Sequence, residues 1–251
     1  MNLLEVDRVS RYFDGLAAVD DVSFAIEKGD LVGLIGPNGA GKTTLFNLIS
    51  GFQPLSGGTV RFSGRTVDGK KPHAIARLGM SRTFQNLRIF PNMSVFDNTS
   101  VGAVGIVGQS GWNAVFGTAA RAETISRRSW AALEKVGLAS VAGDLAANLS
   151  YGKRKYLEIA RALAMEPELL ILDEPAAGLN DSETAELAAF IKTLNAEGIT
   201  IMLVEHDMTL VMGICRRVIV LASGRKIGDG TPEVVRADPA VLEAYLGTDD
   251  A

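Results

Sequence analysis

The sequence predicts an α/β fold with a largely parallel sheet and an inserted helical subdomain. Short apolar runs rich in Val and Ile alternate with segments of helical period, which is typical of parallel sheets covered by helices. A glycine-rich turn separates one such run from the helix that follows it, and a long central stretch is helical throughout. The 251 residues, of which 47% are hydrophobic and 22% charged, suffice to bury one sizeable core.

The first α/β stretch begins with strands expected at residues 3–9 and 22–26. A third apolar run, residues 31–35, leads directly into glycines, and a helix is expected over residues 42–50, where Gly51 ends it. The predicted unit of strand, tight loop and helix places the loop at the carboxyl end of a buried strand.

The second α/β stretch repeats the alternation. Strands are expected at residues 169–172, 200–204 and 217–221, and residues 182–197 have the period of a helix. Four apolar residues of that helix share one face, namely Leu187, Phe190, Ile191 and Leu194.

The central stretch has no convincing strand pattern. Residues 93–165 combine helical periods with Gly-rich connections, which predicts a helical subdomain inserted into an α/β core of residues 1–92 and 166–230. Residues 231–251 are expected to close the single domain as a short helical tail.

Composition excludes several classes of protein. The net charge is -4, from 25 basic and 29 acidic residues, so no nucleic-acid partner is expected. Cys215 is the single cysteine and the N-terminus lacks a basic and an apolar region, which favours a cytosolic protein. Residues 98–120 contain no charged side chain, but five glycines interrupt them, so no membrane span is expected.

A phosphate-binding motif stands between the third strand and its helix. It matches G-x-x-x-x-G-K-[ST] and consists of Gly36, Pro37, Asn38, Gly39, Ala40, Gly41, Lys42 and Thr43. The glycines let backbone N–H groups converge on phosphate oxygens at the positive end of the helix. Lys42 is predicted to reach the β- and γ-phosphates, and the Thr43 hydroxyl to bind Mg²⁺.

Two acids follow the strand at residues 169–172. Because parallel sheets bind ligands at the carboxyl ends of their strands, Asp173 and Glu174 are expected at the same edge as the phosphate loop. Asp173 can hold Mg²⁺ through water, and Glu174 can face the water that attacks the γ-phosphate.

Three weaker signals accompany these motifs. Ser150 is a good N-cap, yet Lys153, Arg154 and Lys155 crowd the first turn of its helix, which suits an incoming phosphate or is simply a solvated basic turn. His206 after a strand can polarise a phosphate, and the Gln85 amide oxygen can reach Mg²⁺ or water, although either residue alone is also compatible with a structural role.

Taken in order along the chain, these motifs resemble those of ABC transporter ATP-binding subunits. The similarity extends over essentially the whole chain and is closest to the branched-chain amino acid importers. The stretches that carry it are 33–39, 82–85, 149–153, 175–180, 205–208 and 243–247.

The resemblance implies a P-loop NTPase core with a parallel sheet plus an antiparallel β part, and ATP and Mg²⁺ as cofactors. Catalysis would rest on Glu174, His206 and Lys42, and the cation on Thr43, Gln85 and Asp173. The residues implied around the nucleotide are Phe13, preferred over Tyr12 as the adenine-stacking ring, Val19, the eight residues of the phosphate motif, Thr44, Gln85, Ser150, Tyr151, Gly152 and Asp173.

The resemblance also implies partners. A second ATPase subunit, the same chain or a paralogue, would pair head to tail so that its Ser150 and Gly152 close over the ATP. Two transmembrane permease subunits, and indirectly a solute-binding protein, would complete an importer on the inner face of the cell membrane.

Some sequence features leave alternatives open. Tyr151 and Lys153 replace the general family's second Gly and its Gln, and Asn180 stands where many members have Asp.

The function also has alternatives. Within the transport class, these are import of another small organic solute, and export of lipid or lipopolysaccharide. An ABC ATPase acting on nucleic acid or ribosomes, and a kinase or GTP switch, are the alternatives from other classes.

Overall fold

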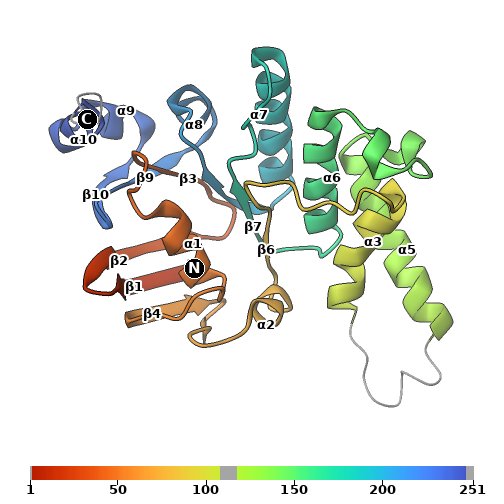
Figure 1. Cartoon of the computed structure of the whole chain (residues 1–251), viewed down its shortest axis with the longest axis horizontal. Coiled ribbons are helices and arrows are strands. Elements are labelled where there is room, and N and C mark those ends of the chain that lie inside the picture. The colour runs from red at the N-terminus through yellow and green to blue at the C-terminus, as the bar shows by residue number, and fades with distance from the viewer. Residues whose placement is uncertain (1, 108–117, 247–251) are drawn as a thin grey trace.

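The structure is a computed structural model in which residues 2–107 and 118–246 are described. Its strands form two sheets (Figure 1). The four-stranded sheet is antiparallel and has the order β2 (Leu16–Glu27), β1 (Asn2–Phe13), β4 (Gly57–Phe62) and β5 (Arg65–Thr66). The antiparallel β part implied by the family resemblance is thereby confirmed.

The six-stranded sheet is parallel except at one edge. Its order is β10 (Arg225–Gly230), β9 (Arg217–Ala222), β3 (Leu31–Ile35), β8 (Thr200–Val204), β7 (Leu169–Asp173) and β6 (Met80–Arg82). Only β10 runs antiparallel to its neighbour. The strands expected at 31–35, 169–172, 200–204 and 217–221 are all observed.

The elements missed by the sequence analysis are mostly short or exposed. They are strands β4, β5, β6 and β10 and helices α2 (Pro72–Ala76) and α8 (Met208–Ile214). β1 and β2 are also longer than expected, at 12 residues each.

Helix α1 (Lys42–Ile49) is packed between the two sheets (Figure 1). Leu45, Phe46 and Ile49 are fully buried in one cluster with side chains from both sheets. This packing holds α1 rigidly, and with it the first residues of the helix, which belong to the phosphate motif.

The opposite face of the six-stranded sheet is covered by helices that include α8 and α7 (Asp181–Ala196). Of the four residues expected on one face of α7, Leu187, Ile191 and Leu194 are buried and Phe190 is partly buried. Helices α9 (Pro232–Ala237) and α10 (Pro239–Leu246) follow β10 at the C-terminal end.

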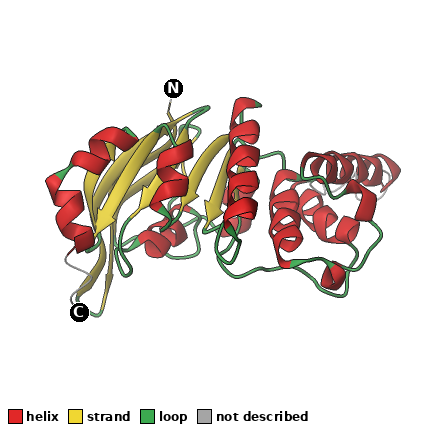
Figure 2. Cartoon of the chain, turned by 90° about the horizontal axis from the view of Figure 1, so that it is seen from above, coloured by secondary structure: helices red, strands yellow, loops and turns green. Residues whose placement is uncertain are grey.

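Residues 93–107 and 118–165 contain α3 (Val95–Ile106), α5 (Thr118–Lys135), α6 (Tyr151–Leu163) and two short 3-10 turns, Ala139–Val141 and Ala146–Asn148. The three α-helices pack against one another beside the sheet edge that ends in β6 (Figures 1 and 2). An isolated bridge between Ser94 and Leu145 is the β pairing described in this part. Residues 108–117 of the uncharged segment, and 247–251 of the tail, lie outside the described residues.

Candidate nucleotide site

The predicted site residues follow the carboxyl ends of neighbouring strands. The phosphate loop follows β3, Glu174 follows β7, His206 lies just beyond β8, and Gln85 lies three residues beyond β6. Since β3, β8, β7 and β6 are adjacent and parallel, these ends meet at one edge of the sheet.

The phosphate loop depends on glycine at both of its ends. At Gly36, an added Cβ would lie 2.1 Å from the Leu221 carbonyl oxygen. At Gly41, where φ is +96°, an added Cβ would lie 2.4 Å from the Ala18 carbonyl oxygen. Gly41 is also the N-cap of α1 and supplies no capping side chain, so the helix start keeps N–H groups for an anion.

Lys42 is buried and folded back over the loop. Its Nζ donates to the Gly36 carbonyl at 2.6 Å and to the Pro37 carbonyl at 3.0 Å. Burial lowers the pKa of Lys42, while the charges of Glu174 and Asp173 act against that change. The ammonium group is thus positioned inside the loop that the sequence predicts to bind phosphate.

Glu174 has an unusual, left-handed backbone conformation. Its φ is +48°, a left-handed value that is uncommon for a non-glycine residue, and its N–H donates to the Val204 carbonyl at 2.9 Å. Its Oε2 accepts a 2.7 Å bond from Gln85 Nε2 and lies 3.9 Å from His206 Nδ1. The structure therefore brings together Gln85, Glu174 and His206.

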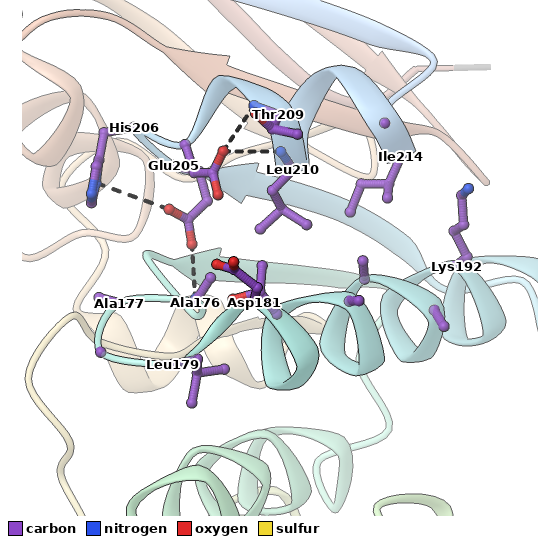
Figure 3. A pocket seen from close by; sticks show the side chains of 17 residues that line it. Ala176, Ala177, Leu179, Asp181, Lys192, Glu205, His206, Thr209, Leu210 and Ile214 are labelled. Atoms are coloured by element: carbon purple, nitrogen blue, oxygen red, sulfur yellow. Dashed lines mark hydrogen bonds and ion pairs between the residues drawn. The ribbon is translucent and has the colours of Figure 1, made fainter.

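Glu205 is a buried carboxylate that the sequence analysis missed as a site residue. Its Oε1 accepts from the Ala176 N–H at 2.8 Å, and its Oε2 lies 4.0 Å from His206 Nδ1 (Figure 3). Burial raises the pKa of Glu205 and the Glu174 charge adds to the increase, against the Ala176 bond and His206. A charged residue directly after the apolar residues 201–204 of strand β8 was the available sequence signal.

A cavity of about 840 Å³ lies between α7 and α8 (Figure 3). Glu205, His206 and residues 176–179 contribute to its wall, whereas Lys42 and Asp173 do not. The larger cavity is therefore not the place where most of the predicted site residues converge.

Three residues expected at a cation share a smaller cavity of about 320 Å³, namely Thr43, Gln85 and Asp173. Their hydroxyl, amide and carboxylate oxygens are hard donors that suit Mg²⁺. Among the described residues no cluster of three His, Cys, Asp or Glu side chains could hold a metal alone. This donor set fits a cation that retains water and phosphate ligands, as Mg²⁺ does in nucleotide sites.

Asp173 has a buried partner that the sequence analysis did not assign. Arg82 Nη2 lies 2.7 Å from Asp173 Oδ2, and the two side chains are 6% and 5% exposed. An arginine at the end of the short, mostly buried strand β6 was the signal, but its partner lies 91 residues away.

Ser150, Tyr151 and Gly152 lie apart from the phosphate loop. Ser150 caps α6 by accepting from the Lys153 N–H, and the Tyr151 hydroxyl donates to the Ala177 carbonyl at 3.2 Å. Within the described part of the chain, no hydrogen bond joins these three residues to residues 36–44. One copy of the chain does not bring the two halves of the predicted site together.

The three cations predicted at the start of α6 lie there, but they differ in their surroundings. Arg154 turns back to donate to the Leu149 carbonyl at 2.9 Å and to the Ala147 carbonyl. Lys155 is buried and donates to the Glu174 carbonyl at 3.3 Å, so Lys153 alone is an exposed cation of this first turn. The three charges diverge because successive residues of a helix point in different directions.

The residues expected near adenine differ from one another in exposure. Phe13 is 38% exposed at the end of β1, with the Arg11 guanidinium 4.5 Å from its ring centre. Val19 is fully buried in the core, so its side chain offers no surface to a nucleotide. Asn180 forms a capping box with Glu183 at the start of α7, which assigns its side chain a local structural role.

A phosphate loop at a helix start, with an acid pair at the end of a nearby parallel strand, defines the P-loop class of nucleotide-hydrolysing domains. Comparison with known proteins narrows this class. The ABC transporter family model matches residues 19–177, and the model for branched-chain amino acid ATP-binding cassette transporters matches residues 225–251. The chain belongs to the ABC transporter family, as one of its ATP-binding cassettes.

Similar proteins extend over nearly the whole chain. The high-affinity branched-chain amino acid transport ATP-binding protein BraF of Pseudomonas aeruginosa is 43% identical, with 98% of each chain covered. LivG of Salmonella typhimurium, which has the same description, is 44% identical, also with 98% of each covered. The ADP conformation of the ATP-binding cassette MJ1267 is similar in structure, with a TM-score of 0.86, 32% identity and coverage of 98% of this chain and 99% of that one.

Proposed function

We propose that this chain is the ATP-hydrolysing subunit of an importer for branched-chain or related amino acids. The observation that carries the proposal is the convergence of Lys42, Gln85, Asp173, Glu174 and His206 at one sheet edge. The cargo class is supported by the similarity to BraF and LivG over nearly their full lengths.

Each converging side chain has a role that its position allows. Glu174 orients or deprotonates the water that attacks the γ-phosphate, since its carboxylate is held by Gln85 and faces His206. Lys42 and His206 stabilise negative charge on the γ-phosphate as the bond to the leaving phosphate breaks. Thr43, Gln85 and Asp173 would hold Mg²⁺, which neutralises phosphate charge when bound.

Closure by a second ATPase subunit completes the proposed site. Because Ser150 and Gly152 do not bond to the phosphate loop of their own chain, they are available to face the ATP of another copy or of a paralogue. ATP binding closes the pair, and hydrolysis reopens it.

A position on the inner face of the cell membrane, bound to two permease subunits that receive cargo from a solute-binding protein, follows from the importer assignment. No helix within the described ranges is both long and apolar enough to span a membrane. The separate permease subunits therefore provide the membrane path in this proposal.

Replacing Glu174 tests the hydrolytic part of the proposal. Glu174→Gln should bind ATP but hydrolyse it at least about 100-fold more slowly, because the amide cannot act as a base. It should also accumulate as a closed dimer, measured by size-exclusion chromatography with ATP. Glu168→Gln is the matched control, since Glu168 precedes the same strand at its other end and pairs with the exposed Lys28. Near wild-type turnover of Glu174→Gln would remove Glu174 from this role.

The transport part is tested by purifying the tagged protein from its native membranes in mild detergent and identifying its partners by mass spectrometry. Permease subunits and a related ATPase should be recovered, and the ligand of the associated solute-binding protein then identifies the cargo. Identification of a different solute, or of a lipid exporter, would change only the proposed cargo and would leave the proposed ATPase function in place. Recovery of ribosomal proteins or nucleic acid without a permease would contradict the transport function.

A further inference from the structure

Arg82 is a buried cation with no role in the proposed chemistry. Its guanidinium forms an ion pair with Asp173, with 2.7 Å between Nη2 and Oδ2, and both side chains are almost fully buried. Burying two charges has a large desolvation cost, so a buried ion pair alone contributes little to stability. The position of this pair, next to the proposed cation site, indicates a functional use.

The guanidinium is held through both of its terminal nitrogens, Nη1 and Nη2. Nη1 donates to Asn47 Oδ1 at 2.9 Å and to Ser50 Oγ at 3.1 Å, both at the end of α1 or just beyond it. Three phenylalanine rings surround the group, with their centres 5.2 to 5.9 Å from its central carbon, namely Phe46, Phe52 and Phe84. Arg82 thus joins β6, α1 and the end of β7 through one planar group that cannot rotate freely.

This arrangement determines which carboxylate oxygen of Asp173 remains available. Oδ2 is bound to Arg82, whereas Oδ1 accepts no hydrogen bond from the described residues. The backbone N–H of Asp173 donates to Thr83 Oγ1 at 3.2 Å, which fixes the main chain as well. Thr43, Arg82, Gln85 and Asp173 line the same cavity of about 320 Å³.

We propose that Arg82 is a positioning residue for the metal site, which holds Asp173 through Oδ2 and leaves Oδ1 directed at the cation that accompanies ATP. The inference rests on the proposed function. A guanidinium near a cation site also repels the cation, which by itself would weaken binding. The rigid anchoring of Arg82 by α1 and the three rings favours pre-organisation as the larger effect, because residues that orient a metal ligand typically contribute about 10- to 100-fold to metal affinity.

The test is the contribution of Mg²⁺ to nucleotide affinity in Arg82→Gln. ADP affinity is measured by calorimetry with Mg²⁺ and with EDTA, and the ratio of the two affinities is the Mg²⁺ effect. We expect Arg82→Gln to reduce this ratio by about 10- to 100-fold. Affinity in EDTA should remain within about twofold of wild type, because the phosphate loop is intact.

Two further variants separate positioning from general damage. Arg217→Gln is the matched control, since Arg217 forms a similar pair with Asp229, at 2.7 Å, outside the site. It should leave the Mg²⁺ ratio unchanged. Asp173→Asn should reduce the ratio, and adding Arg82→Gln to it should cause little further loss, because Arg82 acts through Asp173.

Two kinds of result would overturn the inference. One is an unchanged or increased ratio in Arg82→Gln, which includes an equal loss of affinity with and without Mg²⁺, and the other is additive losses in the double variant. If Arg82→Gln does not fold, Arg82→Lys replaces it, since this variant keeps a positive charge but loses the planar guanidinium that bonds Asp173 and the end of α1 together. Arg82→Lys should then reduce the ratio as well, and a wild-type ratio would contradict positioning by the guanidinium. Absence of any Mg²⁺ effect in the wild-type protein would instead contradict the proposed function.

Discussion

At the scale of single residues, Glu205 joins two segments of the site. It holds the Ala176 N–H in the loop after Glu174, and its second oxygen faces His206 (Figure 3). The Glu205 side chain is 1% exposed, so water cannot replace its bond to the Ala176 N–H. Glu205 therefore helps to hold residues 176–180 in place beside the more exposed His206.

Two substitutions of Glu205 should have different effects. Glu205→Ala leaves the buried Ala176 N–H without an acceptor, which should cost about 1–3 kcal/mol of unfolding free energy and slow ATP turnover. Glu205→Gln retains an acceptor oxygen and avoids burying a charge, so its stability should remain close to wild type. Urea unfolding and ATPase assays measure both effects. Equal stability of the two variants would contradict the importance of the Ala176 bond.

The residues found from sequence share one property. Lys42 and Glu174 belong to local patterns whose spacing follows from the strand, loop and helix around them. Arg82 and Glu205 were missed because their roles depend on partners that are distant in sequence, at 91 and 29 residues for Asp173 and Ala176. Residue type alone does not specify such a pairing.

At the scale of elements, the crossing of α3 and α6 depends on one glycine. A Cβ added at Gly102 would lie 2.0 Å from the Arg161 carbonyl oxygen of α6. The main chains of the two helices therefore approach more closely than any side chain at this position allows.

Gly102→Ala should destabilise the protein by about 1–3 kcal/mol, since the helices must separate to admit the methyl group. Gly105→Ala is the matched control on the same helix, because nothing lies within 4 Å of an added Cβ there. That change should be neutral or stabilising by up to about 1 kcal/mol through helix propensity. Urea unfolding compares the two variants, and equal destabilisation would contradict the role of the close approach.

The prediction of elements was strongest where strands are buried on both faces. β3, β7 and β8 are fully buried and mostly apolar, and each was expected within one residue of its observed bounds. β10 and β4 were missed because they are only partly buried and contain glycine, so neither an apolar run nor an alternation marks them.

At the scale of the whole molecule, the two sheets are joined by packing and by Arg217. Its Nη1 donates to the Ala25 carbonyl of β2 at 2.7 Å, while its other nitrogens bind Asp229 of β10. With α1 buried between the sheets, opening one layer exposes the other. The core is therefore expected to unfold cooperatively.

Cys215 allows this cooperativity to be measured. It is the single cysteine, it is 5% exposed, and burial raises the pKa of its thiol to about 12. At pH 8, a small thiol reagent should label the native protein slowly and the urea-unfolded protein quickly, because the thiolate forms readily once burial is lost. Saturating ATP should slow native labelling further, as bound ligand stabilises the folded state. Rapid labelling of the native protein would show local opening near α8.

Local spacing and buried, mostly apolar strands are enough to predict the fold class, the phosphate loop and the acid pair from the amino-acid sequence. Three features depend instead on packing between distant segments: Arg82 pairs with Asp173, Glu205 accepts from the Ala176 N–H, and Lys155 is buried against the Glu174 carbonyl. They could not be predicted because a buried polar group takes its partner from whatever the packed chain places beside it, and packing brings together residues that are distant in the sequence.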